Sequence, residues 1–165
     1  MSVRNLRYSL LWLLTSYFVS VSALADDVPN LSGLWRPEML GTADNLSPID
    51  VEWYLSINQD ESCVVVSKFL TLTGTQEVYR YRLDGSENFA DNVVPNGERW
   101  QEISHAEWME GKLVIEATIT REYRASWDAR ITYSLDSEGQ LRIMRTEPSL
   151  GGGKLVTETQ IWVRQ

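Results

Sequence analysis

Few residues in this sequence are of the types that carry out chemistry, and their spacing matches no catalytic or metal-binding motif. The chain has one histidine, His105, and one cysteine, Cys63, which are too few ligands for a zinc site. No G-x-S-x-G motif, phosphate-binding loop or dinucleotide fingerprint occurs. We therefore predict no catalytic residue, no metal site and no cofactor, and we expect a protein that is not an enzyme.

Acidic residues leave one catalytic alternative open. Glu107 with Glu110, or Glu102 with Glu116 across a predicted hairpin, could pair as general acid and base. Glycoside hydrolysis needs two carboxyl groups at a fixed separation in a cleft. An enzymatic interpretation would also need ionisable groups that converge inside a pocket with perturbed pKa values. The chain has 23 Asp and Glu residues, so chance pairs are expected and these pairs alone indicate no activity.

Aromatic residues are the main candidates for binding a ligand, because they offer a large apolar area with a polar handle. Five of them lie on the predicted inner faces of strands: Trp53, Tyr79, Tyr81, Trp127 and Tyr133. Either they line a cavity that holds one small molecule, or they fill the interior. Ligand sites are concave and mostly apolar with few polar groups, and an aromatic barrel with a polar rim fits that description.

The elements that must position these side chains are β-strands. Apolar and polar residues alternate in the sequence, which is typical of an antiparallel sheet with one packed face and one wet face. Turn signals such as Asp84-Gly85 and Gly151-Gly152-Gly153 separate the strands. About eight strands follow a short first one, and their ranges are 33–36, 51–58, 63–72, 77–83, 98–108, 112–120, 126–136, 140–146 and 155–163.

Short turns between neighbouring strands predict an all-β, up-and-down meander. Closing such a sheet into a barrel removes its unpaired edges. We therefore predict a single antiparallel β-barrel of about 8–9 strands, with a β-sandwich as the alternative. A barrel of this size holds either packed side chains or one small ligand. The longest predicted loops, 37–50 and 87–97, could cover the barrel mouth.

Residues 1–25 have the three parts of a secretory signal peptide. Arg4 and Arg7 precede a mainly apolar run over 10–21, and Ala23-Leu24-Ala25 forms an A-x-A cleavage site. A membrane anchor is the alternative, but the apolar run is short for a span of about 20 residues. We predict cleavage after Ala25, which removes 25 of the 165 residues and leaves one domain, 26–165, in the periplasm or outside the cell.

Charge and cysteine content restrict the partners of this domain. The net charge of −8 becomes −10 when Arg4 and Arg7 leave with the signal. Such an acidic protein is a poor match for nucleic acid or an anionic membrane surface. No second apolar segment is long enough to span a bilayer. Cys63 has no partner for an intrachain disulfide, and its apolar neighbours predict a buried, inert thiol.

The stretch NLSGLW contains a G-x-W motif, Gly33-Leu34-Trp35, at the first predicted strand. This start resembles that of lipocalin-like and avidin-like barrels, including secreted bacterial proteins with lipocalin-like domains. The resemblance continues through 83–85, 108–115 and 133–141, and ends on the aromatic residue and arginine of 161–164. Unlike a lipocalin, the chain has no helix after the last strand and no paired cysteines, so the identity of a ligand does not transfer.

The resemblance implies roles for three residues at one end of the barrel. In lipocalins the tryptophan of the motif closes the barrel floor, and an arginine of the last strand packs over its indole. Trp35 would then be the plug and Arg164 its cap, held by a cation–π contact. Gly33 would allow the backbone to pack closely beside them.

Two functions follow from these observations. The first is a secreted, non-catalytic binding protein that holds a small apolar or amphipathic molecule in the barrel. The second is a solid-core barrel that acts through its outer face as an envelope interaction module or inhibitor, which predicts an exposed apolar patch. The presence or absence of an internal cavity distinguishes the two.

Overall fold

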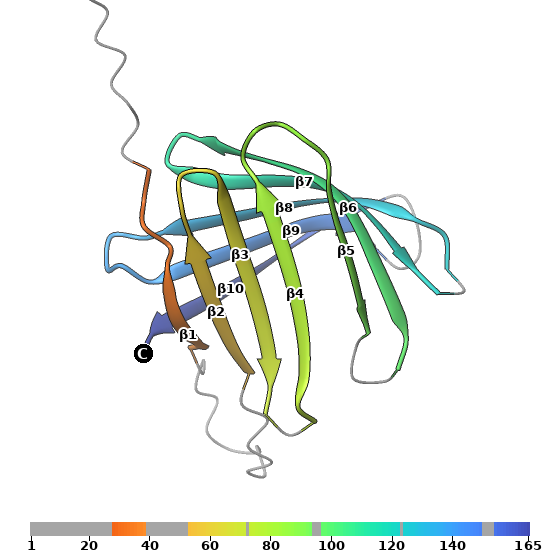
Figure 1. Cartoon of the computed structure of the whole chain (residues 1–165), viewed down its shortest axis with the longest axis horizontal. Coiled ribbons are helices and arrows are strands. Elements are labelled where there is room, and N and C mark those ends of the chain that lie inside the picture. The colour runs from red at the N-terminus through yellow and green to blue at the C-terminus, as the bar shows by residue number, and fades with distance from the viewer. Residues whose placement is uncertain (1–27, 39–52, 72, 94–96, 123, 150–153) are drawn as a thin grey trace, which may run out of the picture.

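The computed structural model of the chain describes residues 28–38, 53–71, 73–93, 97–122, 124–149 and 154–165. They form one antiparallel sheet that wraps into a nearly closed barrel (Figure 1). This confirms the predicted all-β barrel and excludes a sandwich of two sheets. The ten strands are β1 (Gly33–Pro37), β2 (Trp53–Gln59), β3 (Cys63–Leu70), β4 (Thr75–Arg82), β5 (Asn88–Val93), β6 (Arg99–Met109), β7 (Lys112–Arg121), β8 (Trp127–Leu135), β9 (Leu141–Pro148) and β10 (Leu155–Arg164).

The strands follow one another around the barrel, and β10 returns to pair with β1 (Figure 1). Short polar turns can join neighbouring strands in this meander. In the β8–β9 turn, a carboxylate oxygen of Asp136 accepts the backbone N–H groups of Glu138 and Gln140, each at 3.0 Å. Gly139 has a φ of 76°, which a glycine adopts without steric cost. Among the described residues, no helix is long and apolar enough to cross a bilayer.

The structure has one strand more than predicted. The additional strand is β5, which lies inside the segment 87–97 that the sequence indicated as a loop. Asn88 and Asn92 are buried, whereas Phe89 and Val93 are 61% and 56% exposed. This strand therefore reverses the usual arrangement of apolar residues inside and polar residues outside, and hydrophobic periodicity cannot indicate it.

Asparagine side chains join β4 to β5, the two ends of the sheet. The Oδ1 atom of Asn92 accepts the N–H of Val78 at 3.0 Å, and its Nδ2 donates to the Val78 carbonyl at 3.4 Å. In the same way, Oδ1 of Asn88 accepts the N–H of Arg82 at 2.8 Å. These amides replace a backbone ladder, so the edge of β4 keeps partners for its polar groups.

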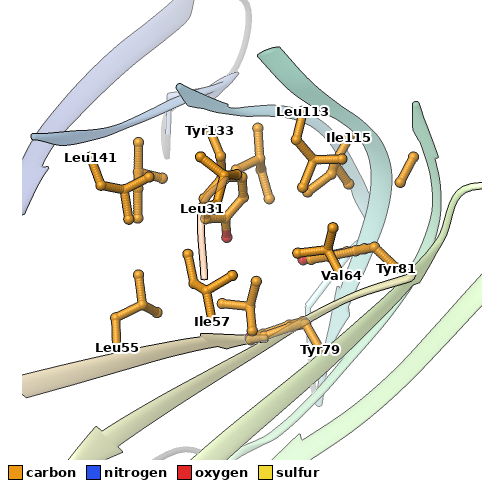
Figure 2. Packing of buried hydrophobic residues seen from close by; sticks show 14 of the residues in the cluster. Leu31, Leu55, Ile57, Val64, Tyr79, Tyr81, Leu113, Ile115, Tyr133 and Leu141 are labelled. Atoms are coloured by element: carbon orange, nitrogen blue, oxygen red, sulfur yellow. The ribbon is translucent and has the colours of Figure 1, made fainter. Parts of the chain in front are cut away.

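Apolar side chains fill one part of the interior. Figure 2 shows Leu55, Ile57 and Val64 pointing from one wall toward Leu113 and Leu141 on the opposite wall. All five are at most 3% exposed. Burial of this kind is worth about 25 cal/mol per Å² of apolar surface, so this cluster is the main source of stability for a chain without a disulfide.

The composition of the interior changes along each strand. On β9, Leu141 and Ile143 belong to the apolar core, whereas Arg145 and Glu147 follow on the same inner face. On β7, Ile115 and Ile119 are buried in the core, and Arg121 ends the strand. The barrel thus has an apolar half and a polar half.

Candidate functional site

The closed end of the barrel is built around Trp35, which is fully buried. Its indole Nε1 donates to the carbonyl of Leu31 at 3.1 Å. The guanidinium carbon of Arg164 lies 4.7 Å from the ring centroid, a cation–π distance. A Cβ added to Gly33, whose φ is +155°, would lie 3.4 Å from Arg164 Nε and 3.5 Å from Trp35 Nε1. The structure thus brings these residues of the opening motif and the last strand together.

The polar half of the barrel contains a cavity of about 220 Å³. Inward-facing side chains of seven strands, β3, β4 and β6 to β10, form its wall. Tyrosines and charged side chains alternate there with a few aliphatic ones. Tyr79, Tyr81, Glu102 and Tyr133 are buried, and Lys68 and Arg145 are half-buried. The interior is therefore neither completely filled nor purely apolar.

Three of the five predicted ligand-binding residues line this cavity: Tyr79, Tyr81 and Tyr133. The rings of Tyr79 and Tyr81 are nearly parallel, with centroids 6.2 Å apart, and Figure 2 shows them on the wall opposite Tyr133. Trp127 lies beside the cavity and lines an adjoining outer groove of about 760 Å³. Trp53 is partly buried against the apolar core and lines neither space. The structure groups the tyrosines and separates the two tryptophans from them.

Glu102 is a buried carboxyl group in the cavity wall, only 2% exposed. Burial raises the pKa of Glu102, and hydrogen bonds from Tyr81 and Ser104 offset part of that shift. The Tyr81 hydroxyl donates to Oε1 of Glu102 at 3.2 Å. Burial also raises the pKa of Tyr81 well above its ordinary value, so this hydroxyl keeps its proton.

Lys68 faces the cavity from β3, directly across the ladder from Glu77. Its Nζ lies 5.9 Å from the ring centroid of Tyr79. Burial lowers the pKa of Lys68, while the charge of Glu77 acts in the opposite direction. Within the described ranges, no carboxylate lies within ion-pair distance of the Lys68 ammonium.

Two arginines contact one indole at the outer end of the cavity. The guanidinium carbon of Arg121 lies 4.2 Å from the ring centroid of Trp100, and that of Arg145 lies 5.2 Å from it. Trp100 and Arg121 are direct partners in the β6–β7 register, which explains the stacking. Trp127 adds a second ring, 5.4 Å from the Arg121 guanidinium carbon.

Glu147 neutralises only one of these arginines. Its Oε2 accepts hydrogen bonds from Nε of Arg145 and Nε1 of Trp127, both at 2.9 Å. Nη2 of Arg145 is also 2.9 Å from this oxygen, as an ion pair without hydrogen-bond alignment. Within the part of the chain that the structure describes, Arg121 has aromatic contacts but no carboxylate partner.

The carboxylate pairs that the sequence offered for acid–base catalysis do not form. Glu102 lies opposite Ile119 and points inward, whereas Glu116 is exposed and pairs with Arg130 at 2.7 Å. Glu107 and Glu110 are both exposed on the outside of the barrel. Glu107 and Glu110 therefore lie on the outer surface, and Glu102 and Glu116 lie on opposite faces of the sheet.

Several residues of this site were not predicted as ligand-contacting: Lys68, Trp100, Glu102, Arg121 and Arg145. A signal for them exists in the sequence. Glu102 has the same alternation phase as Ala106, and Arg145 the same phase as Ile143, so each ionisable group occupies a position that alternation assigns to the interior. Charged residues in the buried phase would have indicated a polar cavity.

Neither a metal site nor a known relative assigns a function to this cavity. Within the described residues, no three His, Cys, Asp or Glu side chains gather where they could hold a metal ion. His105 is exposed, and Cys63 is buried without a disulfide. Comparison with protein-family models finds no match for the chain, and comparison with curated proteins finds none either.

Proposed function

We propose that this protein is a secreted, lipocalin-like binding protein that holds one small amphipathic molecule without changing it chemically. The observation that carries this proposal is the cavity of about 220 Å³ between Tyr79, Tyr81 and Tyr133. Three rings supply apolar area, while Lys68 and Glu102 supply polar contacts in the same wall. The space is open to solvent, and its wall combines aromatic rings with ionisable groups, which suits an amphipathic ligand.

The polarity of the wall favours an amphipathic ligand over an apolar one. A purely apolar molecule would remove water from Lys68, Glu102 and Arg145 without giving them hydrogen bonds, which costs free energy. The inner cavity of about 220 Å³ is smaller than the roughly 300–1,000 Å³ of typical ligand pockets, so it holds only a small group. The adjoining groove of about 760 Å³ offers room for a longer molecule to continue outward.

A specific surface feature keeps the second function as a candidate. Phe89 and Ile103 are direct partners across β5 and β6, and they are 61% and 43% exposed. Such a pair on the outer face would suit a partner protein with an apolar surface. The cavity is the stronger observation, because it gathers apolar rings and polar groups in one concave wall, whereas the exposed pair is a small apolar surface.

Native mass spectrometry of the protein purified gently from its own periplasm tests the first proposal. We expect an additional mass that disappears on denaturation, on a chain that begins at Asp26. Ile143→Phe adds a ring inside the cavity and should abolish the additional mass. Met144→Phe, which adds the same ring at a 42% exposed position next to it, should retain the mass.

A bare polypeptide for the natural protein would contradict a retained ligand and favour the outer face as the functional surface. Equal loss of the additional mass in both variants would place the ligand outside the cavity. A chain that still contains residues 1–25 would contradict export with cleavage after Ala25.

A further inference from the structure

We propose that the molecule bound in this barrel is an organic anion with a flat body, whose acidic group lies against Arg121 where the inner cavity meets the outer groove. This inference rests on the proposed function and adds the charge and shape of the ligand. Three features of the wall carry it: the position of Arg121, the charges around it, and the hydrogen-bond donors beside it.

Arg121 occupies the junction of the two spaces, because its side chain lines both the cavity and the groove. The stack with Trp100 at 4.2 Å and Trp127 at 5.4 Å holds the guanidinium in a fixed orientation. A guanidinium that is held in place loses little further freedom when it binds an oxyanion, and its planar fork matches a carboxylate. A ligand that extends from the cavity into the groove passes this group.

The charges of the wall favour an anion. Three basic and three acidic side chains line the inner cavity: Lys68, Arg121, Arg145, Glu102, Glu147 and Glu158. Burial favours the neutral form of Glu102, and Arg145 with Glu147 forms an internal pair. Lys68 lies across the ladder from the buried Glu77, whose charge acts on it. Arg121 is then the basic side chain of this wall that has no carboxylate partner among the described residues, and the remaining carboxylate, Glu158, is exposed. The wall at Arg121 is therefore locally basic in a protein whose net charge is −8.

Like charges at the indole strengthen this argument. Arg121 and Arg145 both lie within 5.2 Å of the Trp100 ring centroid, and their mutual repulsion is larger in a partly buried site than in water. The indole Nε1 of Trp100 and Nε of Arg121 are buried and, among the described residues, have no acceptor. An oxyanion supplies both the negative charge and the acceptors that this part of the wall lacks.

A matched pair of probes tests the proposal. Naphthalene-2-carboxylate and naphthalene-2-carboxamide have nearly the same shape and differ in charge, and isothermal titration calorimetry near pH 7 measures the binding of each. We expect the carboxylate to bind roughly tenfold more tightly or better, because hydrogen bonds to a charged group are stronger than neutral ones. Arg121→Gln should remove most of that preference, because it weakens binding of the carboxylate far more than binding of the carboxamide.

Arg80→Gln is the control, because it removes one positive charge from an exposed position on β4, between the two cavity tyrosines. It should leave both affinities unchanged. Equal affinities of the two probes for the natural protein, or an equal loss of both in Arg121→Gln, would overturn the anion proposal alone. If neither probe binds at millimolar concentration, the proposed function fails as well, and this inference with it.

Discussion

Glu102 shows how one residue sets the balance between stability and function in this interior. Its carboxyl group is 2% exposed, and Tyr81 donates a hydrogen bond to it at 3.2 Å. Burial disfavours the charged form, which raises the pKa of Glu102 above its ordinary value. A stability-driven core would place an aliphatic side chain here, so the retained carboxyl indicates a use for its polarity.

The sign of the pH dependence follows from this shift. Below the ordinary glutamate pKa the group is protonated in both the folded and unfolded chains, so its contribution to stability is fully present. The unfolded chain releases this proton at a lower pH than the folded chain does. The contribution to stability is therefore lost as the pH rises through the raised folded-state pKa. Glu102 therefore makes the protein less stable toward neutral pH than an uncharged side chain of the same shape would.

Glu102→Gln should raise the free energy of unfolding at about pH 8 by more than it does at about pH 4, because glutamine cannot ionise and its carbonyl still accepts from Tyr81. Urea denaturation at the two pH values measures the difference. Glu107→Gln, an exposed position on the same strand, serves as the control and should be within about 0.5 kcal/mol of the natural protein at both pH values. An identical effect of Glu102→Gln at both pH values would show that the carboxyl ionises freely.

At the scale of residues, the sequence predicted the aromatic side chains of the cavity wall but not the charged ones. Tyr79, Tyr81 and Tyr133 follow the alternation of their strands and line the cavity as inner-face residues. Lys68 and Arg145 follow the same alternation, but a charged side chain is by default assigned to solvent, because burying an unpaired charge is costly. The cavity is open to water, so these groups occupy inner-face positions without losing all hydration. Charged residues in the buried phase were therefore the available signal of a polar cavity, and the default assignment to solvent overlooked it.

At the scale of elements, the junction between β4 and β5 is the weakest part of the sheet. Every other neighbouring pair has a backbone ladder, whereas this pair depends on the side chains of Asn88 and Asn92. A ladder adds a hydrogen bond for nearly every residue, and an amide side chain supplies one or two at fixed points. Opening of the barrel should therefore begin here.

Asn92→Ala should lower the free energy of unfolding by about 1–3 kcal/mol, because it removes the acceptor of the part-buried Val78 N–H. It should also accelerate amide hydrogen exchange at Val78 more than at residues of β7. Asn58→Ala, an exposed position on β2, is the control and should change neither quantity appreciably. Unchanged exchange at Val78 in Asn92→Ala would mean that the asparagine does not hold this junction.

The same junction explains which element the sequence did not reveal. Nine strands were predicted, most of them from alternation that matches their burial, as in β4, β6 and β8. The remaining strand, β5, has Asn88 and Asn92 inside and Phe89 and Val93 outside, so its inward side chains bond to β4 instead of packing in a core. Local propensity and periodicity describe packing, and they carry no information about a side chain that replaces a backbone partner.

At the scale of the whole molecule, the barrel has two unlike ends. Trp35 and Arg164 close one end with a buried indole and a stacked guanidinium. At the other end, the described residues of 28–38 reach only 161–164 of β10: β1 pairs with 162–164, and the Glu38 N–H donates to the Ile161 carbonyl at 2.8 Å. The segment 155–160 of β10 pairs with β9 alone within the described chain. Inner-face residues of this segment, such as Glu158 and Gln160, are exposed, which fits an entrance to the cavity.

This asymmetry predicts an exchange profile that depends on position along β10. In an antiparallel strand, alternate N–H groups point to opposite neighbours, so a strand with one neighbour protects only every second amide. We expect alternating fast and slow exchange over 155–160 by hydrogen-exchange NMR, and uniformly slow exchange in the middle of β8, which pairs with both β7 and β9. Uniform protection over 155–160 would mean that another segment covers the free side of β10 in solution, and β10 would then not border the entrance to the cavity.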